Sequence, residues 1–440
     1  MMNRTIIIFL ALLCIFFTSF QTAYSSEDVP SGQSSETTKK ASTKGITADV
    51  FGDKGGYFHP FISLETVHTS NLFFTHGHED KSFITTIAPG IWLALPESRE
   101  KLLNISTSPS TPGGIEFSHM QADKSRRMQT YFLYSPSFVY YSGFSKYNHT
   151  NHTAEGFFNY NFGFDVSLEL FDQYNIRSDI NDDGLGKKLD EYYDNIATIV
   201  ASYEPSPKLK FRFDFSNYIT RFDKNVNQFR DRKDNSIAAY VFYKFMPKTS
   251  VFMEYERTYI NYDNRSNDDS IENRYYAGID WEISAKSKGQ VKGGYIEKKF
   301  DKNNSRDEED FSLEAQIQHA ITPKSSVLFS AFQKYHETTL PDSYFIRTRG
   351  ISSAFLLRFT QKWSGAINAS YTRERYEGSG MHGAIDERDD DIFGIGPAIK
   401  FDAKKWLVFE AGYHYTTRNS NYSIYDYDNE MIYLRMKIDL

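Results

Sequence analysis

Apolar and polar residues alternate along most of the chain, from about residue 57 to the C-terminus. The last segment shows this most clearly: Ile432, Leu434, Met436, Ile438 and Leu440 fall on one side, and Tyr433, Arg435, Lys437 and Asp439 fall on the other. The segments at 209–215, 275–283 and 407–415 repeat the pattern. A period of two is typical of a β-strand whose two faces meet different surroundings. The sequence therefore predicts an all-β chain.

The connections between these segments fall into two classes. Short turns containing lysine occur at 207–208, 247–248, 287–288, 323–324, 361–362 and 404–405, and longer polar loops such as 223–234, 263–273, 301–310, 377–391 and 419–428 lie between them. Outer-membrane β-barrels collect short turns at the periplasmic end and long loops at the outer end, whereas a two-sheet sandwich has no reason to do so. We therefore predict a transmembrane, up-and-down antiparallel β-barrel with extracellular long loops.

The alternating segments start near residues 57, 82, 128, 152, 164, 191, 209, 235, 249, 273, 289, 310, 325, 344, 363, 391, 406 and 429, which gives eighteen strands. We accept 16–18, because the stretch 97–127 is too long for a periplasmic turn and contains Pro109 and Pro112. This stretch is predicted to be a periplasmic insertion, which either folds against the mouth of the barrel or conceals a miscounted hairpin. An even strand number places both termini in the periplasm.

The N-terminus has the features of a secretory signal peptide. An apolar run from Thr5 to about Phe20 follows Arg4 and ends at Ala23-Tyr24-Ser25, a small-x-small pattern. We predict a signal peptide at 1–25, a flexible periplasmic tail at 26–46 and an outer-membrane barrel at 47–440. The alternative for the apolar run is a single membrane anchor. The only cysteine, Cys14, lies inside the run, so the exported chain has no thiol chemistry.

Composition excludes two classes of protein. The 50 Lys and Arg residues against 57 Asp and Glu give a net charge of −7, so there is no basic excess for a nucleic-acid partner. The mean hydropathy is −0.54, and only the N-terminal run approaches the length that a membrane-spanning helix needs. A helical membrane protein is therefore excluded.

The polar faces of the strands identify candidate pore-lining residues. A Lys or Arg on the lipid face near the bilayer midplane costs about 2–4 kcal/mol, so charged faces are assigned to the lumen. Nine bases are placed there (Lys210, Arg212, Arg274, Lys292, Lys298, Lys400, Arg418, Arg435 and Lys437), with six acids (Asp214, Asp280, Glu282, Glu314, Glu410 and Asp439) and with Tyr276, His414 and Tyr433. This selection predicts a mixed, slightly basic wall.

Several short motifs occur along the chain: TSNLF at 69–73, APG at 88–90, HTA at 152–154, LELFD at 168–172, GYHY at 412–415, RNSN at 418–421 and YDN at 427–429. Together they resemble the motifs of the putative β-barrel porin type 2 proteins of Gram-negative outer membranes. The resemblance implies an outer-membrane barrel, and it implies a link with exopolysaccharide synthesis and secretion. The long stretch at 97–127 departs from the compact strand pair expected of the family.

The remaining motifs give weak candidates for chemistry. His414 has Glu410 on the same strand face, but no nucleophile accompanies the pair, and we predict a pore-lining histidine and no enzyme. The pairs His76/His78 and His149/His152 are more consistent with solvated loops than with a metal site. Asp179, Asn181, Asp183 and Asp190 have the spacing of a calcium loop, although Lys187 and Lys188 lie within it. No cofactor is predicted.

Two functions remain open from the sequence. The first is a porin-like channel that passes small hydrophilic solutes or oligo- and polysaccharides by diffusion. The second is a surface receptor or adhesin that binds through long acidic loops such as 386–391, with its lumen plugged. In both cases the predicted partners are outer-membrane lipid, lipopolysaccharide and the outer-membrane insertion machinery, and in the first case a polysaccharide cargo.

Overall fold

The computed structural model describes residues 56–98, 105–116, 127–163, 165–180, 188–223, 227–263, 269–283, 286–302, 307–340, 343–378 and 387–439. The predicted signal peptide and tail lie outside these residues. The strands are β1 Phe58–Thr69, β2 Ser82–Leu95, β3 Met128–Tyr141, β4 His149–Asn161, β5 Val166–Ile180, β6 Leu189–Ser206, β7 Leu209–Phe222, β8 Arg232–Met246, β9 Thr249–Tyr262, β10 Ser270–Ile283, β11 Ser287–Phe300, β12 Glu308–Thr322, β13 Ser325–His336, β14 Ser343–Arg358, β15 Trp363–Gly378, β16 Arg388–Lys404, β17 Leu407–Ser420 and β18 Tyr427–Asp439.

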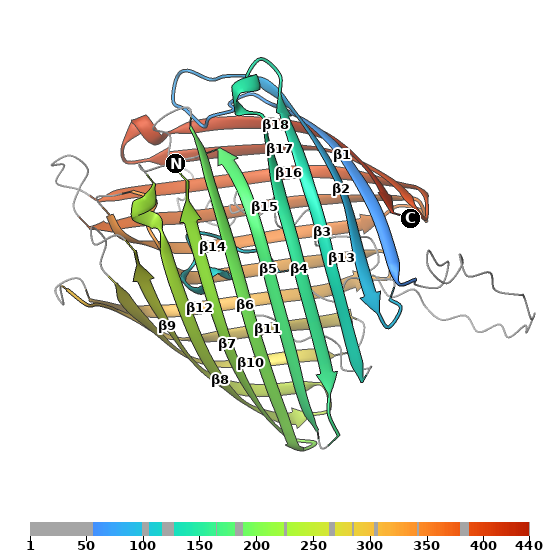
Figure 1. Ribbon diagram of the computed structural model, residues 1–440, viewed down its shortest axis with the longest axis vertical. Coiled ribbons are helices and arrows are strands. Elements are labelled where there is room, and N and C mark those ends of the chain that lie inside the picture. The colour runs from blue at the N-terminus through green and yellow to red at the C-terminus, as the bar shows by residue number, and fades with distance from the viewer. Residues whose placement is uncertain are drawn as a thin grey trace, which may run out of the picture.

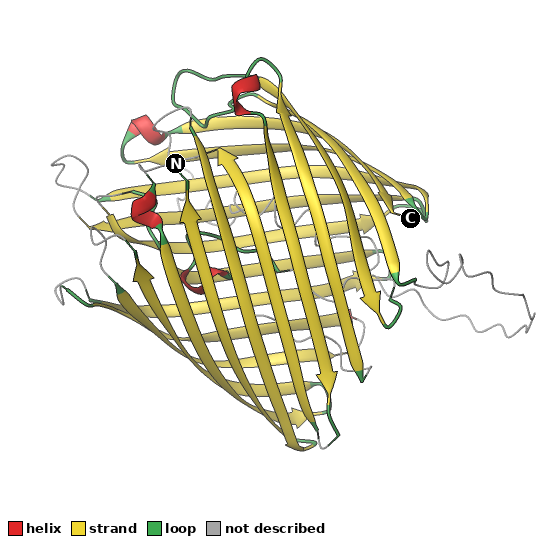
Figure 2. Cartoon of the chain, viewed as in Figure 1, coloured by secondary structure: helices red, strands yellow, loops and turns green. Residues whose placement is uncertain are grey.

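The strands form one closed antiparallel barrel (Figures 1 and 2). Each strand pairs with its neighbours in the chain, and β1 pairs with β18, from Phe61 opposite Asp439 to Thr69 opposite Met431. Closure removes the free edges that cannot be satisfied in lipid. The predicted fold class is therefore confirmed at the upper strand number, eighteen.

The two faces of each strand differ in exposure. Outward-facing Met253 is 71% exposed, and Ile432 and Leu434 are each 59% exposed, whereas inward-facing Lys292 and Lys298 are 1% and 0% exposed. Apolar side chains therefore cover the outside and charged side chains cover the inside, the reverse of a water-soluble protein. This arrangement suits a barrel whose outer surface contacts lipid.

Connections at the two ends of the barrel differ in length, as the sequence predicts. Short turns such as 207–208, 247–248 and 323–324 join strands at one end, and connections such as 70–81 and 223–231 join them at the other. We call these the short-turn end and the long-loop end. In the described part of the chain, no helix has the length and apolar character to cross a bilayer.

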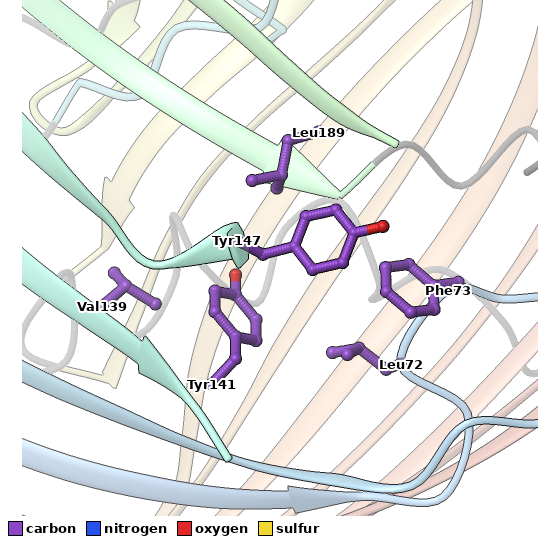
Figure 3. Packing of buried hydrophobic residues seen from close by; sticks show 6 residues of the cluster. All are labelled: Leu72, Phe73, Val139, Tyr141, Tyr147 and Leu189. Atoms are coloured by element: carbon purple, nitrogen blue, oxygen red, sulfur yellow. The ribbon is translucent and has the colours of Figure 1, made fainter. Parts of the chain in front are cut away.

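An apolar cluster packs the loops at the long-loop end (Figure 3). Leu72 and Phe73 come from the loop between β1 and β2, and Tyr147 comes from the short helical turn η2, Ser145–Tyr147. They pack with Val139 and Tyr141 of β3 and Leu189 of β6. The TSNLF motif at 69–73 thus packs the loop between β1 and β2 against β3, η2 and β6.

Candidate functional site

A segment between β2 and β3 crosses the interior of the barrel. We call residues 105–116 the lumen strap; it contains the helical turn η1, Pro112–Gly114, which Figures 1 and 2 show between the near and far walls. The strap contacts β5 near its start and β13 at its end. Strands β6 to β12 separate β5 from β13 on one side, and β14 to β18 with β1 to β4 separate them on the other. The strap is also bonded to β6 and β8, so it runs inside the barrel from β5 past β8 to β13.

The first attachment of the strap is to β5 and β6. The Thr107 hydroxyl donates to Asp194 Oδ1 at 2.6 Å, and Arg177 Nη1 donates to the Thr107 carbonyl at 3.1 Å. Asn175 Nδ2 donates both to Thr107 Oγ1, at 3.2 Å, and to Asp194 Oδ1, at 2.9 Å. Thr107, Asn175 and Asp194 are all buried. This end of the strap is therefore held by a dense polar network.

The second attachment is to β8. Arg232 donates to the carbonyl oxygens of Pro109 and Thr111, at 2.5 and 2.9 Å, and Asp234 Oδ2 accepts from the N–H of Gly113 at 2.9 Å. Arg232 and Asp234 also form an ion pair with each other, with 3.1 Å between Nε and Oδ2. The planar guanidinium suits this role because it presents several donors in fixed directions.

Two glycines let the strap lie directly on the wall. Gly113 and Gly114 have φ values of +73° and +81°, in the left-handed region that favours glycine. A Cβ atom on Gly114 would lie 2.3 Å from the Tyr218 ring, and one on Gly113 would lie 2.7 Å from Ser236 Oγ. The sequence Pro-Gly-Gly at 112–114 is therefore required both by the turn and by the close approach.

The third attachment is to β13. Glu116 Oε2 lies 2.8 Å from His336 Nε2 and accepts from the Thr111 hydroxyl at 2.9 Å. Lys334 donates to the Glu116 carbonyl. Burial alone would raise the pKa of Glu116, but His336, Lys334 and Thr111 lower it to about 2. Glu116 is therefore a carboxylate over the whole physiological range.

Charged side chains on β9 to β13 form two groups of ion pairs on the inner wall. Lys292 lies 2.9 Å from Glu254 and 3.4 Å from Glu314, and Lys334 also lies 2.9 Å from Glu314. Arg274 contacts Glu272 and, at 3.2 Å, Glu256. Buried charges are tolerated when they are paired and hydrogen-bonded. The inner wall is therefore a set of mutually compensated charges.

Tyrosine rings lie against several of these cations. Arg212 lies over the Tyr240 ring at 4.9 Å from its centroid, and Lys292 lies over Tyr276 at 4.4 Å. Such contacts stabilise a cation electrostatically through the ring quadrupole. The wall thus combines charged groups with aromatic faces.

A cavity lies between the strap and the wall. Among the described residues, its charged lining consists of Asp214, Glu256, Glu314 and Glu116 with Arg274 and Lys334. Hydroxyl groups of Thr198, Ser216 and Ser236 also line it. Polar groups of the strap and of the wall therefore line the same cavity.

The predicted pore-lining residues fall into three groups in the structure. Buried side chains belong to Arg212, Arg274, Tyr276, Lys292, Lys298, Glu314, His414, Arg418 and Tyr433, and partly buried ones belong to Lys210, Asp214, Asp280, Lys400, Glu410, Arg435 and Lys437. Glu282 and Asp439 are exposed at strand ends. The structure brings Arg212, Asp214, Arg274, Lys292 and Glu314 together below the strap.

The candidate pair His414 and Glu410 does not form a catalytic arrangement. Glu410 accepts from the Tyr433 hydroxyl at 2.7 Å and lies 3.7 Å from Arg435. His414 packs instead over Gly394 and Gly396, where a Cβ atom would lie within 3.3 and 2.8 Å of its ring. Both residues are part of the wall packing.

Of the four calcium-loop candidates, Asp179 and Asp190 lie in the described part of the chain. Asn181 and Asp183 lie outside the described residues. Asp179 pairs across the ladder with Asp190 and accepts from the Tyr192 hydroxyl at 2.6 Å, while Asp190 accepts from Arg230 at 2.7 Å. A calcium ion at Asp190 would have to compete with that guanidinium.

The members of the two histidine pairs do not come together at a shared metal site either. His76 and His78 are exposed in the loop between β1 and β2. His149 lies 2.8 Å from the Tyr147 carbonyl, whereas His152 lies 2.9 Å from the hydroxyl of Tyr134, an exposed residue of β3. Their separation by three residues places them on opposite strand faces. In the described part of the chain, no group of three His, Cys, Asp or Glu side chains is placed to hold a metal.

Sequence reasoning missed the strap and several acids of the wall. The sequence predicts residues 105–116 only as part of a periplasmic insertion, and the predicted wall does not contain Asp234, Glu254, Glu256 or Glu272. The predicted wall is slightly basic because it includes no residue of β8 or β9 and omits Glu272 of β10. Two signals were available: the Pro-Gly-Gly turn, and the acids that alternate with Val251, Met253 and Tyr255 on β9.

Comparisons with known proteins give one family and several solved structures. The model of the family described as putative beta-barrel porin 2 matches residues 210–440. The structure of OpdF from Pseudomonas aeruginosa in complex with glucuronate is similar, with a TM-score of 0.46, 7% identity and coverage of 87% of this chain and 98% of that one. The structure of OccAB4 from Acinetobacter baumannii is also similar, with a TM-score of 0.45 and 9% identity, and the match covers 88% of this chain and 99% of that one. No curated protein matches the sequence.

Proposed function

Because the chain belongs to the putative beta-barrel porin 2 family, it is a porin-like outer-membrane β-barrel, and we propose that it passes small hydrophilic solutes by diffusion. The observation that carries this proposal is the contrast between the apolar outer face and the charged inner face of one closed barrel. A barrel of this strand number has an interior too wide for its own side chains to fill. The strap then narrows the passage without replacing its polar character.

The proposal extends to oligosaccharides and to a single polysaccharide chain. The cavity between the strap and the wall is lined by carboxylates and by the hydroxyl groups of Thr198, Ser216 and Ser236, which offer hydrogen-bond partners for sugar hydroxyl groups. The link with exopolysaccharide export comes from the family resemblance. In this mode the protein performs no covalent chemistry.

A second candidate function is a surface receptor or adhesin. The observation that favours it is the strap, which is bonded to β5, β8 and β13 and so occupies part of the lumen. In this mode the long loops bind a partner outside the cell and nothing crosses the barrel.

Recording from the purified protein in a planar lipid bilayer separates the two functions. Stepwise conductance increases in potassium chloride are expected for the channel, and swelling of liposomes in sugars of increasing size would then give the size limit. Correctly folded protein that inserts but gives no conductance and no swelling would contradict the channel and favour the receptor.

A further inference from the structure

The cavity between the strap and the wall is richer in acids than in bases. Among its described lining residues, the carboxylates Asp214, Glu256, Glu314 and Glu116 face two cations, Arg274 and Lys334. This balance differs from the slightly basic wall predicted from the sequence.

The cations in this cavity are already bound by carboxylates. Arg274 contacts Glu272 and Glu256, and Lys334 lies 2.9 Å from Glu314. Their side chains are also nearly inaccessible, at 6% and 2% exposure, while those of Asp214 and Glu256 are 16% and 17% exposed. Asp214 and Glu256 are themselves paired, with Arg212 and Arg274, but they are the more exposed members of these pairs. A solute in the cavity therefore meets these carboxylates before it meets the guanidinium groups.

Within the described part of the chain, two buried oxygens of the lining have no hydrogen-bond partner. They are Oε1 of Glu116 and Oγ1 of Thr198, and both residues are 8% exposed. A buried polar atom without a partner is costly, and a carboxylate oxygen is satisfied only by a donor or a cation. Because Glu116 comes from the strap and Thr198 from β6, the unmet acceptors lie on both sides of the cavity.

We propose that this cavity is a selectivity site for cations, which takes hydrated alkali ions and solutes that carry an ammonium group and disfavours those that carry a carboxylate. Carboxylates lining a constriction select for cations because a permeating ion feels them at short range, whereas exposed loop charges are screened beyond about 8–10 Å at physiological salt. The proposal rests on the proposed channel function and adds the charge class of its solutes.

The test is the reversal potential across a potassium chloride gradient, measured in planar bilayers. The wild type should prefer K⁺ over Cl⁻. The double variant Asp214→Asn/Glu256→Gln should lower the K⁺/Cl⁻ permeability ratio by about fivefold for each charge removed, as expected for a unit charge about 4 Å from the ion in a water-like medium. Glycine ethyl ester and acetate, as organic probes, should follow the same order of permeation.

A matched control is Glu65→Gln/Glu410→Gln. These acids are partly buried, contact Arg435 on another part of the wall and do not line the cavity. A wild type without cation preference, or a control that changes selectivity as much as the test variant does, would overturn the proposal. Either result still includes a conductance, so it is distinct from failure of the channel function, in which none is recorded.

Discussion

Arg232 and Asp234, two residues apart on β8, are bonded both to each other and to the lumen strap. The guanidinium donates to the carbonyls of Pro109 and Thr111, and the carboxylate accepts from the N–H of Gly113. Their side chains are 1% and 0% exposed. One ion pair thus connects a membrane-spanning strand to the segment that crosses the lumen.

Replacing Arg232 by Met should release the strap and enlarge the conductance. The substitution leaves Asp234 buried without its partner, so the free energy of unfolding should fall by about 3–5 kcal/mol. Single-channel recording and urea unfolding of the folded barrel measure the two effects.

Arg388→Met is the control for this prediction. Arg388 and Asp390 form an equally buried pair two residues apart on β16, and neither bonds to the strap. The control should lose stability but keep the wild-type conductance. Equal conductance changes in both variants would contradict the role given to Arg232.

Gly114→Ala should displace the strap from the wall. The new Cβ atom would lie 2.3 Å from the Tyr218 ring, and the backbone has a φ of +81°. Backbone strain alone costs about 1 kcal/mol, and the overlap adds a further cost of about 1–3 kcal/mol. Unfolding in urea and single-channel conductance are the measurements.

Gly143→Ala is the control that introduces backbone strain without steric overlap. Gly143 has a similar φ of +78°, but a Cβ atom there meets nothing within 4 Å. It should therefore cause the smaller loss of stability and no change in conductance. A conductance change in Gly143→Ala matching that in Gly114→Ala would refute the steric explanation.

The attachment of Glu116 should weaken in acid. Its pKa is lowered from 4.5 to about 2, so its contribution to stability is complete above about pH 4.5 and is lost as the pH falls towards 2. Glu116 also raises the pKa of His336 above its ordinary value of 6.5, so the comparison is made in more acidic solution. The difference in unfolding free energy between wild type and Glu116→Gln, measured from pH 5 to pH 3, should shrink as the pH falls below about 4.5. A difference that grows in acid would contradict this sign.

Topology can be tested on intact cells. The length of the connections predicts that the loop containing Asn421 is extracellular and that the turn containing Lys324 is periplasmic. An epitope tag at Asn421 should bind antibody without permeabilisation, and one at Lys324 should bind only after it. Antibody binding on intact cells to the tag at Lys324 alone would mean that the barrel has the opposite orientation.

The wall was predictable because its pattern is local. Alternation places the start of β7 at Leu209 and of β9 at Thr249, and it separates the Ile432 face of β18 from the Arg435 face. A period of two holds wherever one face meets lipid and the other meets polar groups, so each strand carries its own evidence.

The strap was not predictable in this way because its structure depends on distant partners. Thr107 binds Asp194 and Glu116 binds His336, and these contacts join segments far apart in the chain. Irregular segments have no period to detect. Only the length of the stretch and its prolines marked it as different, and neither feature specifies a place inside the barrel.

The pairing of β1 with β18 has a consequence for the order of assembly. Once that seam is hydrogen-bonded, the interior can be entered only through the two mouths of the barrel. The strap, which leaves β2 close to the seam, bonds to strands as late in the chain as β13. It therefore takes its place either before the ring closes or afterwards through the mouth at the short-turn end, where β2 ends and β3 begins.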